Sequence, residues 1–201
     1  RIEVGENGMV WYEQAPSRML DDPVSSKDVA AAFSSLPSSA TELHSLQPQV
    51  VQTVPPTALR DLLVPVVSRE YLQALQPKRE RLEQLCNTHS IDGVHLFVLA
   101  ENDEGIDAYA RNFSLGMTPE GIGEDPATGT LAGALACYLH TRGALQRGVQ
   151  PIVFHQGPVG HLSELRVMLQ TTAGENITNV KIGGRAVPAG KIFIPSKTKE
   201  V

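Results

Sequence analysis

Apolar residues cover every face of one segment of the chain, residues 131–139, in which almost no polar group appears. A helix that is apolar all round has to be surrounded by protein, so this pattern predicts a buried helix. Asp125 stands where an N-cap residue belongs, and Pro126 fits the first helical position. Gly143 ends the pattern in the manner of a left-handed C-cap. We therefore expect a central helix over residues 126–142.

Short apolar or alternating runs surround this segment and are typical of strands. The chain opens with two such runs on either side of Asn7-Gly8, which is a strong hairpin signal. Short helices are expected after Ser25 and Ser68, because serine is a good N-cap, and from Pro77. Further strands are expected at residues 49–53, 61–67, 94–99, 107–113, 152–155, 165–169, 177–182 and 191–194. One long apolar helix among short strands predicts an α+β architecture in which a sheet wraps around the helix.

Composition narrows the classes of partner. The 201 residues carry a formal net charge of −5 and no basic cluster, which argues against a nucleic-acid-binding surface. No apolar run reaches the roughly 18 residues of a membrane span, so we expect no membrane partner. Cys86 and Cys137 lie in helix-like segments and are expected to be buried, reduced thiols. Neither these cysteines nor the six histidines show metal-ligand spacing, so no metal is predicted.

The start of the predicted helix carries the clearest candidate chemistry. Thr128, Gly129 and Thr130 place small polar side chains beside the free backbone N–H groups of a first turn, which attract a carboxylate or phosphate. Gly129 lets a ligand approach the backbone and the Thr130 hydroxyl can donate to it, although tight helix packing also selects small residues. Asp125 can transfer a proton beside such a ligand. An aspartate at this position also serves as a plain N-cap, worth ~1 kcal/mol.

Three further polar residues have both functional and structural interpretations. His155 is a candidate proton carrier or substrate ligand, with an exposed or hydrogen-bonded imidazole as the alternative. Arg111 either binds substrate or pairs with a buried carboxylate. Glu124 neighbours Asp125, and paired carboxylates can divide acid and base roles. Because adjacent side chains usually point apart, we expect a solvated Glu124.

Residues 124–130 read Glu-Asp-Pro-Ala-Thr-Gly-Thr, and this run resembles the EDPATGS signature of the PhzF-like family, the phenazine-biosynthesis isomerases and their relatives. Weaker matches fall in the family's order at residues 111–113, 121–122 (a Gly-Ile turn in this pattern), 154–157, 183–187 and 191–194. The resemblance implies the diaminopimelate-epimerase-like fold. In that fold, two pseudo-symmetric domains each wrap a strongly curved mixed or antiparallel sheet around a central buried helix. The active site lies between the domains, at the N-termini of the two helices.

On that pattern the chain divides into three parts. Residues 1–14 are the last hairpin of a first domain, residues 15–184 form the second, C-terminal domain, and residues 185–201 are a closing strand and tail. A second copy of the helix motif is missing, so most of the first domain is expected to lie outside this chain. The chain also opens at Arg1 directly into the hairpin, which favours missing upstream sequence.

The resemblance implies a cofactor-independent, cytoplasmic isomerase that moves a proton on a small carboxylate-bearing metabolite. Asp125 is then the catalytic residue, and the substrate-binding residues are Thr128, Gly129, Thr130, Arg111 and His155. In the family a glutamate and a Gly-His pair of the first domain complete the site, and because both are missing we expect this chain alone to be inactive. The chain departs from the family at Thr130, which is usually serine, and at residues 160–163, which read Gly-His-Leu-Ser in place of Gly-Arg-Pro-Ser.

Two other functions stay open. The first is a non-catalytic binding or interaction module that retains the fold. The second is a homodimer that rebuilds a two-domain cleft from two copies of the chain, through the apolar face that a missing half would expose; a homodimer is the protein partner we expect. A two-thiol racemase does not fit, because Cys137 lies about three turns into the predicted helix and not at its start.

Overall fold

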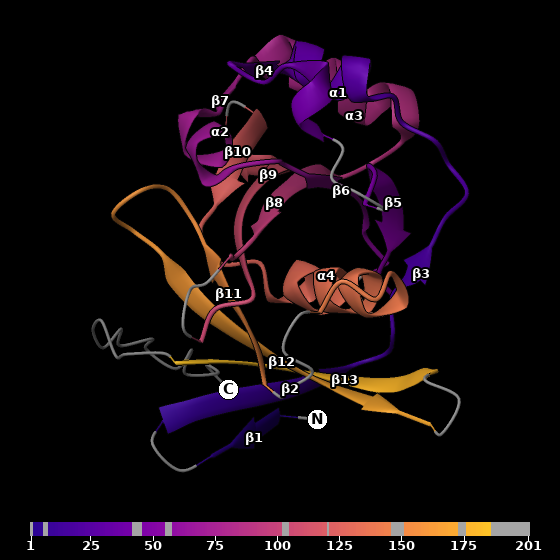
Figure 1. Cartoon of the computed structure of the whole chain (residues 1–201), viewed down its shortest axis with the longest axis vertical. Helices are drawn as coiled ribbons and strands as arrows, with labels where there is room; N and C mark the ends of the chain where they lie inside the picture. Colours follow the sequence, from indigo (N-terminus) through magenta and orange to yellow (C-terminus); the bar gives the residue numbers. More distant parts are fainter. Residues whose placement is uncertain are drawn as a thin grey trace, which may run out of the picture.

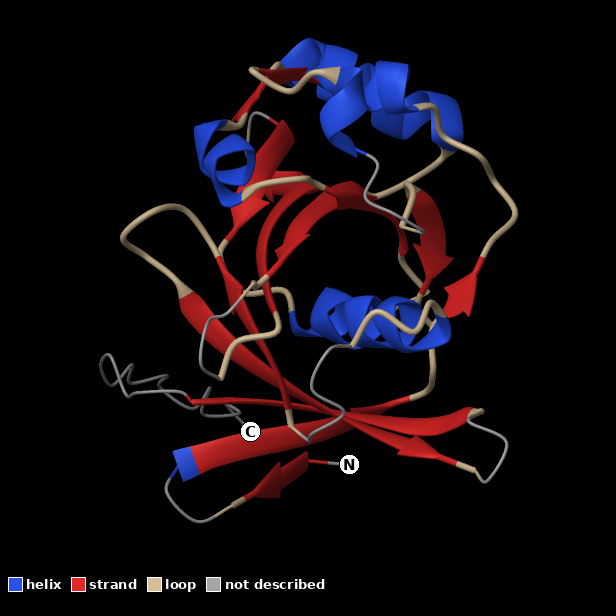
Figure 2. Ribbon diagram, viewed as in Figure 1, coloured by secondary structure: helices blue, strands red, loops and turns tan. Residues whose placement is uncertain are grey.

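One curved sheet surrounds the central helix of the chain (Figure 1, Figure 2). The computed structural model describes residues 2–5, 8–41, 46–54, 58–101, 105–119, 121–145, 151–172 and 176–185. The strands of the sheet are β1 (Ile2–Val4), β2 (Met9–Gln14), β3 (Arg18–Met19), β5 (Gln49–Gln52), β6 (Arg60–Pro65), β8 (Gly93–Leu99), β9 (Ala108–Thr118), β10 (Gly121–Asp125), β11 (Ile152–Gln156), β12 (Ser163–Thr171) and β13 (Ile177–Arg185). Most of the predicted strands are therefore present, with boundaries shifted by one to a few residues.

The strand order makes the sheet mixed. It runs β1-β2-β13-β12-β11-β9-β8-β6-β5-β3, with β10 paired to β9. The pairs β9–β11 and β6–β8 are parallel, and the other pairs are antiparallel. In Figure 1 the strands β9, β8, β6 and β5 arch over one side of the central helix, while β2, β12 and β13 cross its other side. The predicted α+β architecture, a curved mixed sheet around a buried helix, is confirmed.

The helices are α1 (Ser26–Ala32), α2 (Arg69–Ala74), α3 (Arg79–His89) and the central α4 (Gly129–Thr141), with a 3-10 helix η2 (Ser38–Thr41) and a two-stranded sheet of β4 (Phe33–Ser34) and β7 (Gln76–Pro77). Ser25 and Ser68 accept hydrogen bonds from the N–H groups of Asp28 and Tyr71, so both predicted serine caps are confirmed. No helix among the described residues is long and apolar enough to cross a membrane.

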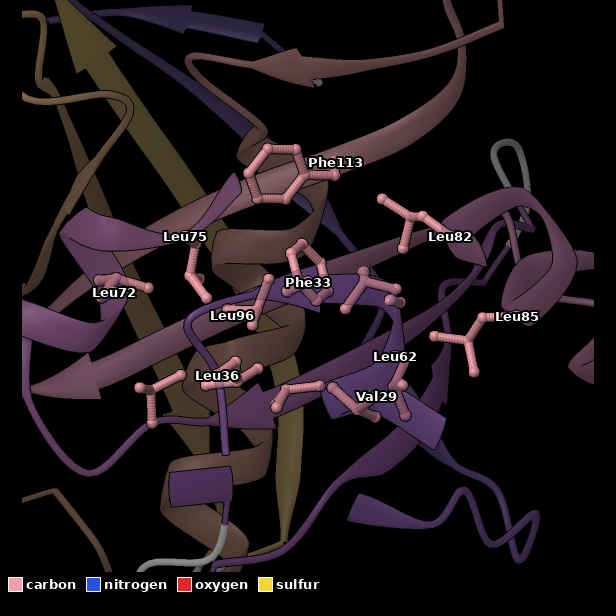
Figure 3. Packing of buried hydrophobic residues seen from close by; sticks show 14 of the residues in the cluster. Val29, Phe33, Leu36, Leu62, Leu72, Leu75, Leu82, Leu85, Leu96 and Phe113 are labelled. Atoms are coloured by element: carbon pink, nitrogen blue, oxygen red, sulfur yellow. The ribbon is translucent and has the colours of Figure 1, made fainter. Parts of the chain in front are cut away.

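Two hydrophobic layers lie on opposite faces of the sheet. The inner layer contains α4, whose residues 131–139 are all buried, as their apolar pattern predicts. The outer layer packs α1, α2 and α3 against β6, β8 and β9 (Figure 3). Phe33 and Phe113 meet there with ring centroids 5.4 Å apart. We call the side of the sheet that faces α4 the inner face and the side that faces α1–α3 the outer face.

The start of α4 differs from the prediction, whereas its end does not. The helix begins at Gly129, with Thr128 as the N-cap residue, and Asp125 is the last residue of strand β10. The predicted Gly-Ile turn at residues 121–122 is the start of the same strand, which pairs with β9. This hairpin pairing extends the chain through Asp125, so the helix begins later than predicted. Gly143 has a φ of +64° directly after the helix, as a left-handed C-cap requires.

The opening hairpin is continuous with the rest of the sheet. Strand β2 pairs antiparallel with β13, from Val180 opposite Gln14 to Arg185 opposite Met9. The assignment of residues 1–14 to another domain stays a prediction, and residues 186–201, with the predicted strand at 191–194, lie outside the described residues. Both cysteines are buried and unpaired, as expected.

Candidate functional site

The start of α4 lacks a side-chain cap. Thr128 takes the N-cap position with φ −96° and ψ 88°, and its hydroxyl accepts no hydrogen bond from the first turn. The N–H groups of a first turn have no acceptor inside their own helix. The amides of Gly129 and Thr130 are therefore available to an anion, and the positive end of the helix dipole lies at the same point.

The Thr128 hydroxyl is engaged on the side away from the helix. It donates to Asp125 Oδ2 at 2.7 Å and accepts from Gln156 Nε2 at 2.8 Å. Gln156 Nε2 also donates to the Asp125 backbone oxygen at 2.7 Å, and Asp125 Oδ1 accepts from the Ala127 N–H at 3.1 Å. The expectation that Asp125 caps the helix is therefore wrong, because its carboxylate instead stabilises the turn that precedes it.

A pocket of about 480 Å³ lies in front of this helix start. Its walls come from β2, β12, β13 and the segment before α4, and the residues lining it are Val10, Tyr12, Asp125, Ala127, Thr128, Gly129, Thr130, Leu165, Ile182, Gly183, Gly184 and Arg185. The sequence-predicted residues Asp125, Thr128, Gly129 and Thr130 are thus brought together in one pocket. All four are partly exposed, so a ligand in the pocket can reach them.

Tyr12 brings a hydroxyl to the helix start from the opening hairpin. A Cβ atom at position 129 would lie 2.8 Å from Tyr12 Oη, so the glycine allows the tyrosine this close approach. Burial raises the pKa of Tyr12 to about 12 from an ordinary value that already lies above neutral pH, so the hydroxyl is protonated and can donate. Arg185, also in the lining, adds a guanidinium that favours an anionic ligand.

Arg111 does not line this pocket. Its guanidinium forms two hydrogen bonds with Glu124, Nε to Oε1 at 2.8 Å and Nη2 to Oε2 at 2.7 Å, and its side chain is 9% exposed. Nη1 donates to the backbone oxygens of Leu72 and Leu75 at the end of α2. The ion-pair interpretation of Arg111 is confirmed. The expectation of a solvated Glu124 is wrong, because the alternation of β10 turns Glu124 to the outer face and Asp125 to the inner face.

His155 also lies away from the pocket. Its neighbours on β11, Phe154 and Gln156, are buried toward α4, so the imidazole points to the outer face. There it packs edge-on against Tyr109, with ring centroids 5.8 Å apart, and its Nε2 lies 3.9 Å from Glu164 Oε2. Its predicted contact with substrate stays a prediction, and this placement does not favour it.

Three residues of the site were not found from the sequence. Tyr12, Gln156 and Arg185 reach the start of α4 from strands that are distant in the chain, so no local spacing links them to residues 125–130. The one local signal was the alternation of the opening hairpin, which places Tyr12 on the same face as its packing partner Ile182. Among the described residues, no group of three or more His, Cys, Asp or Glu side chains is placed to hold a metal ion.

A curved mixed sheet around a buried helix, with an aspartate and an open helix start in one pocket, defines an α+β protein whose candidate site lies at the start of its central helix. The chain belongs to the phenazine biosynthesis-like protein family (PhzC-PhzF), whose family model matches residues 7–191. The predicted membership of the PhzF-like family and its fold is thereby confirmed.

Relatives of known sequence and structure agree with this placement. The chain is 28% identical over 129 residues to an uncharacterized isomerase of Clostridium acetobutylicum, covering 63% of this chain and 41% of the relative. A PhzF-family phenazine biosynthesis protein of Bacillus anthracis shares the fold with a TM-score of 0.71 at 21% identity, over 92% of this chain and 60% of that one. A predicted epimerase from Pseudomonas aeruginosa matches with a TM-score of 0.63 at 28% identity, over 88% and 55%. The chain thus spans only two to three fifths of the length of these relatives.

Proposed function

We propose that this chain forms part of a cofactor-independent isomerase site that moves a proton on a small carboxylate-bearing metabolite. The observation that carries the proposal is the uncapped start of α4, which opens into a pocket together with Asp125, Tyr12 and Arg185. The family supplies the isomerase- and epimerase-like fold, and the proposal adds a reaction for this pocket.

The pocket offers complementary contacts to a carboxylate. The amides of Gly129 and Thr130 and the Tyr12 hydroxyl donate hydrogen bonds to its oxygens, and the Arg185 guanidinium balances its charge. Asp125 then lies beside the bound molecule and serves as the group that accepts or returns a proton. Its oxygens each accept one hydrogen bond from the chain, which leaves each with a further lone pair for this role.

An isomerisation by proton transfer removes one proton from the substrate and returns one at another atom, so its composition and electron count do not change. Among the described residues, Asp125 is the one carboxylate that lines the pocket. We propose that a second acid–base group comes from the part of the relatives' length that this chain does not span. The chain alone is therefore expected to bind the carboxylate without isomerising it.

Binding and chemistry can be tested separately. In a ¹⁵N-labelled chain, acetate is expected to shift the amide signals of Gly129 and Thr130 in a saturable manner, and Arg185→Gln to weaken this binding. Asp125→Asn is expected to tighten acetate binding, because it removes a neighbouring negative charge. Absence of any shift at these two amides in the unaltered chain would contradict the proposal.

The expected inactivity has its own measurement. The chain is incubated in D₂O with a panel of small carboxylic acids, and deuterium at their carbon atoms is followed by mass spectrometry. We expect no exchange above the protein-free rate. Exchange that disappears in Asp125→Asn would overturn the inactivity and assign the whole proton transfer to this chain.

A binding module without catalysis is the second candidate. It is favoured by the two hydrogen bonds that Asp125 accepts from Ala127 and Thr128, since through these bonds the carboxylate stabilises the turn before α4. The discriminating measurement uses a longer protein that includes this chain. If Asp125→Asn leaves its activity unchanged there while the acetate site persists, the binding module is the correct interpretation.

A further inference from the structure

Gln156 is buried at the end of β11, directly against the turn that precedes α4. The residue is 1% exposed, and its strand pairs with β9 on one side and with β12 on the other. A Cβ atom on the next residue, Gly157, would lie 3.5 Å from the backbone oxygen of Pro126 in that turn. The sheet therefore fixes the place from which the Gln156 amide reaches residues 125–128.

The direction of the hydrogen bonds around this amide follows from what each atom can donate. The Asp125 backbone oxygen can only accept, so the Gln156 atom that lies 2.7 Å from it is the amide nitrogen, Nε2. The second Nε2 hydrogen goes to Thr128 Oγ1 at 2.8 Å. The Thr128 hydroxyl accepts this bond and keeps its single hydrogen for Asp125 Oδ2 at 2.7 Å. The bonds therefore run one way, from amide to hydroxyl to carboxylate.

The other end of the same amide makes no such contact. Gln156 Oε1 is buried and has no hydrogen-bond partner in the part of the chain that the structure describes. An unpaired buried oxygen lowers stability, so packing alone does not favour an amide at this position. What Gln156 supplies is the pair of Nε2 hydrogens, and both are directed at the turn that carries Asp125 and Thr128.

We propose that Gln156 is a positioning residue for Asp125 and acts on it through the Thr128 hydroxyl. A threonine hydroxyl turns about its Cβ–Oγ1 bond according to the donors and acceptors around it. The Gln156 donor prevents the hydroxyl hydrogen from pointing at Gln156 and so directs it at Asp125 Oδ2. The carboxylate is thereby held in one orientation as an acceptor, with its remaining lone pairs available for a proton of the substrate.

This inference rests on the proposed function only in the role given to Asp125. The hydrogen bonds themselves belong to the unliganded chain, so they can be tested without a substrate.

The test follows the Asp125 carboxylate and the Thr128 hydroxyl by NMR at pH 7. The χ1 rotamer of Asp125 is determined from three-bond couplings of its β-protons and Cγ, and the Thr128 hydroxyl hydrogen is followed by its exchange with water. The unaltered chain is expected to hold one Asp125 rotamer and a protected hydroxyl hydrogen. Gln156→Met has a similar length but no donor, so we expect the main rotamer to fall to about half of the population and hydroxyl exchange to become about tenfold faster. If Gln156→Met does not fold, Gln156→Leu is measured in the same way.

A double variant shows whether Gln156 acts through Thr128. Thr128→Val removes the hydroxyl with little change of shape, and it is expected to average the Asp125 rotamer to the same extent as Gln156→Met. The two changes combined are expected to add nothing further, because either one breaks the same chain of hydrogen bonds. Further averaging in the double variant would overturn the path through Thr128 and assign the effect to the bond between Gln156 and the Asp125 backbone oxygen.

Phe154→Leu is the matched control on the same strand and the same face of the sheet. Phe154 is 1% exposed and packs in the layer around α4, so this change is expected to lower the midpoint of urea unfolding and to leave the Asp125 rotamer unchanged. Averaging in Phe154→Leu to the same extent as in Gln156→Met would overturn the proposal, because general packing would then set the orientation.

Unchanged Asp125 couplings in the Gln156 variant that folds would also overturn the proposal, whatever the chain binds. Failure of the proposed function appears elsewhere, as the absence of acetate-induced shifts at Gly129 and Thr130 in the unaltered chain.

Discussion

Strands β9 and β10 present one buried polar group to each face of the sheet, and the two groups differ in how completely they are satisfied. On the outer face, Glu124 accepts two hydrogen bonds from Arg111, whose remaining nitrogen donates to the end of α2. On the inner face, Asp125 lies opposite Asn112, and Asn112 lies opposite His95 of the neighbouring strand β8. Among the described residues, Asn112 Oδ1 and both ring nitrogens of His95 lack a hydrogen bond of good geometry, although Asn112 lies close enough to act as a hydrogen-bond partner that partly offsets the lowering of the His95 pKa by burial.

The difference separates a group whose hydrogen bonds are complete from one that we propose to be functional. A buried charged side chain that has all its hydrogen bonds is held in one arrangement, because protonation or rotation would break at least one of them. The inner group keeps spare lone pairs and faces a pocket, so a ligand or a proton can still be accepted. Burial alone therefore does not distinguish the two groups, and the proposed site is the one with incomplete hydrogen bonding next to a pocket.

The largest loss of stability is expected when the ion pair between Arg111 and Glu124 on the outer face is broken. Glu124→Ala leaves the Arg111 guanidinium, 9% exposed, without its carboxylate, and removal of one partner from a buried ion pair costs about 3–5 kcal/mol. Urea unfolding at pH 7 measures this loss.

The neighbouring Asp125→Ala is the matched control for Glu124→Ala. It removes hydrogen bonds from a partly exposed turn, so a loss of only about 1 kcal/mol is expected. Equal losses in the two variants would show that both carboxylates are structural, and the contrast between the faces would fail.

The next largest effect on stability depends on pH and arises from Asp61 on the inner face. Burial, and then the charge of Asp92, raise the pKa of Asp61 to about 7 from 3.8. The folded chain then holds a proton that the unfolded chain releases between about pH 4 and 7, so this group lowers stability as the pH rises through that window. Asp61→Asn is expected to stabilise the chain by roughly 2–4 kcal/mol at pH 8 and by almost nothing at pH 4.

His95 makes the stability of the chain depend on pH in the opposite direction, over an overlapping pH range. Its pKa falls from 6.5 to about 4 on folding, so the unfolded chain binds the extra proton and stability is lost as the pH falls from 6.5 toward 4. The two contributions partly cancel in the unaltered chain. Urea unfolding at several pH values is therefore expected to show a steeper acid loss in Asp61→Asn, and a curve parallel to that of the unaltered chain would contradict this balance.

The sequence was sufficient where a local pattern decides the structure. Residues 131–139 are apolar on every face and lie fully inside the sheet. Ser25 and Ser68 cap helices because an N-cap requires contacts only within the next turn. The motif at residues 124–130 marked the helix start at the pocket for the same reason, since all its members are close in the chain.

The sequence was insufficient to predict the structure where strand pairing determines the conformation of the chain. Asp125 has the residue type and the neighbours of an N-cap, and only the pairing of β10 with β9 carries the chain past it in extended form. The same pairing turns Glu124 to Arg111 and Asp125 to Asn112. Tyr12 and Arg185 reach the pocket through the register of β2 and β13, which are more than 160 residues apart in the chain.

The smallest effect on stability is expected at Gly129, where the inner face meets the pocket. In Gly129→Ala the better helix propensity of alanine, worth about 1 kcal/mol, is offset because its Cβ lies 2.8 Å from Tyr12 Oη and displaces the tyrosine tip. Stability is therefore expected to change by less than about 1 kcal/mol. The new methyl group stands between the first-turn amides and Tyr12, so acetate binding, followed by the Thr130 amide, is expected to be lost.

Gly133→Ala distinguishes this loss from general crowding of α4. Gly133 lies about one turn along the helix and does not line the pocket. Its added Cβ would meet Gln14 Nε2 at 2.8 Å and Ile182 Cδ1 at 3.1 Å, of which Ile182 also lines the pocket. The variant is expected to alter the urea midpoint and to leave acetate binding intact. If Gly129→Ala binds acetate as the unaltered chain does, the open helix start is not the anion site, and the functional side of the contrast between the two faces is lost.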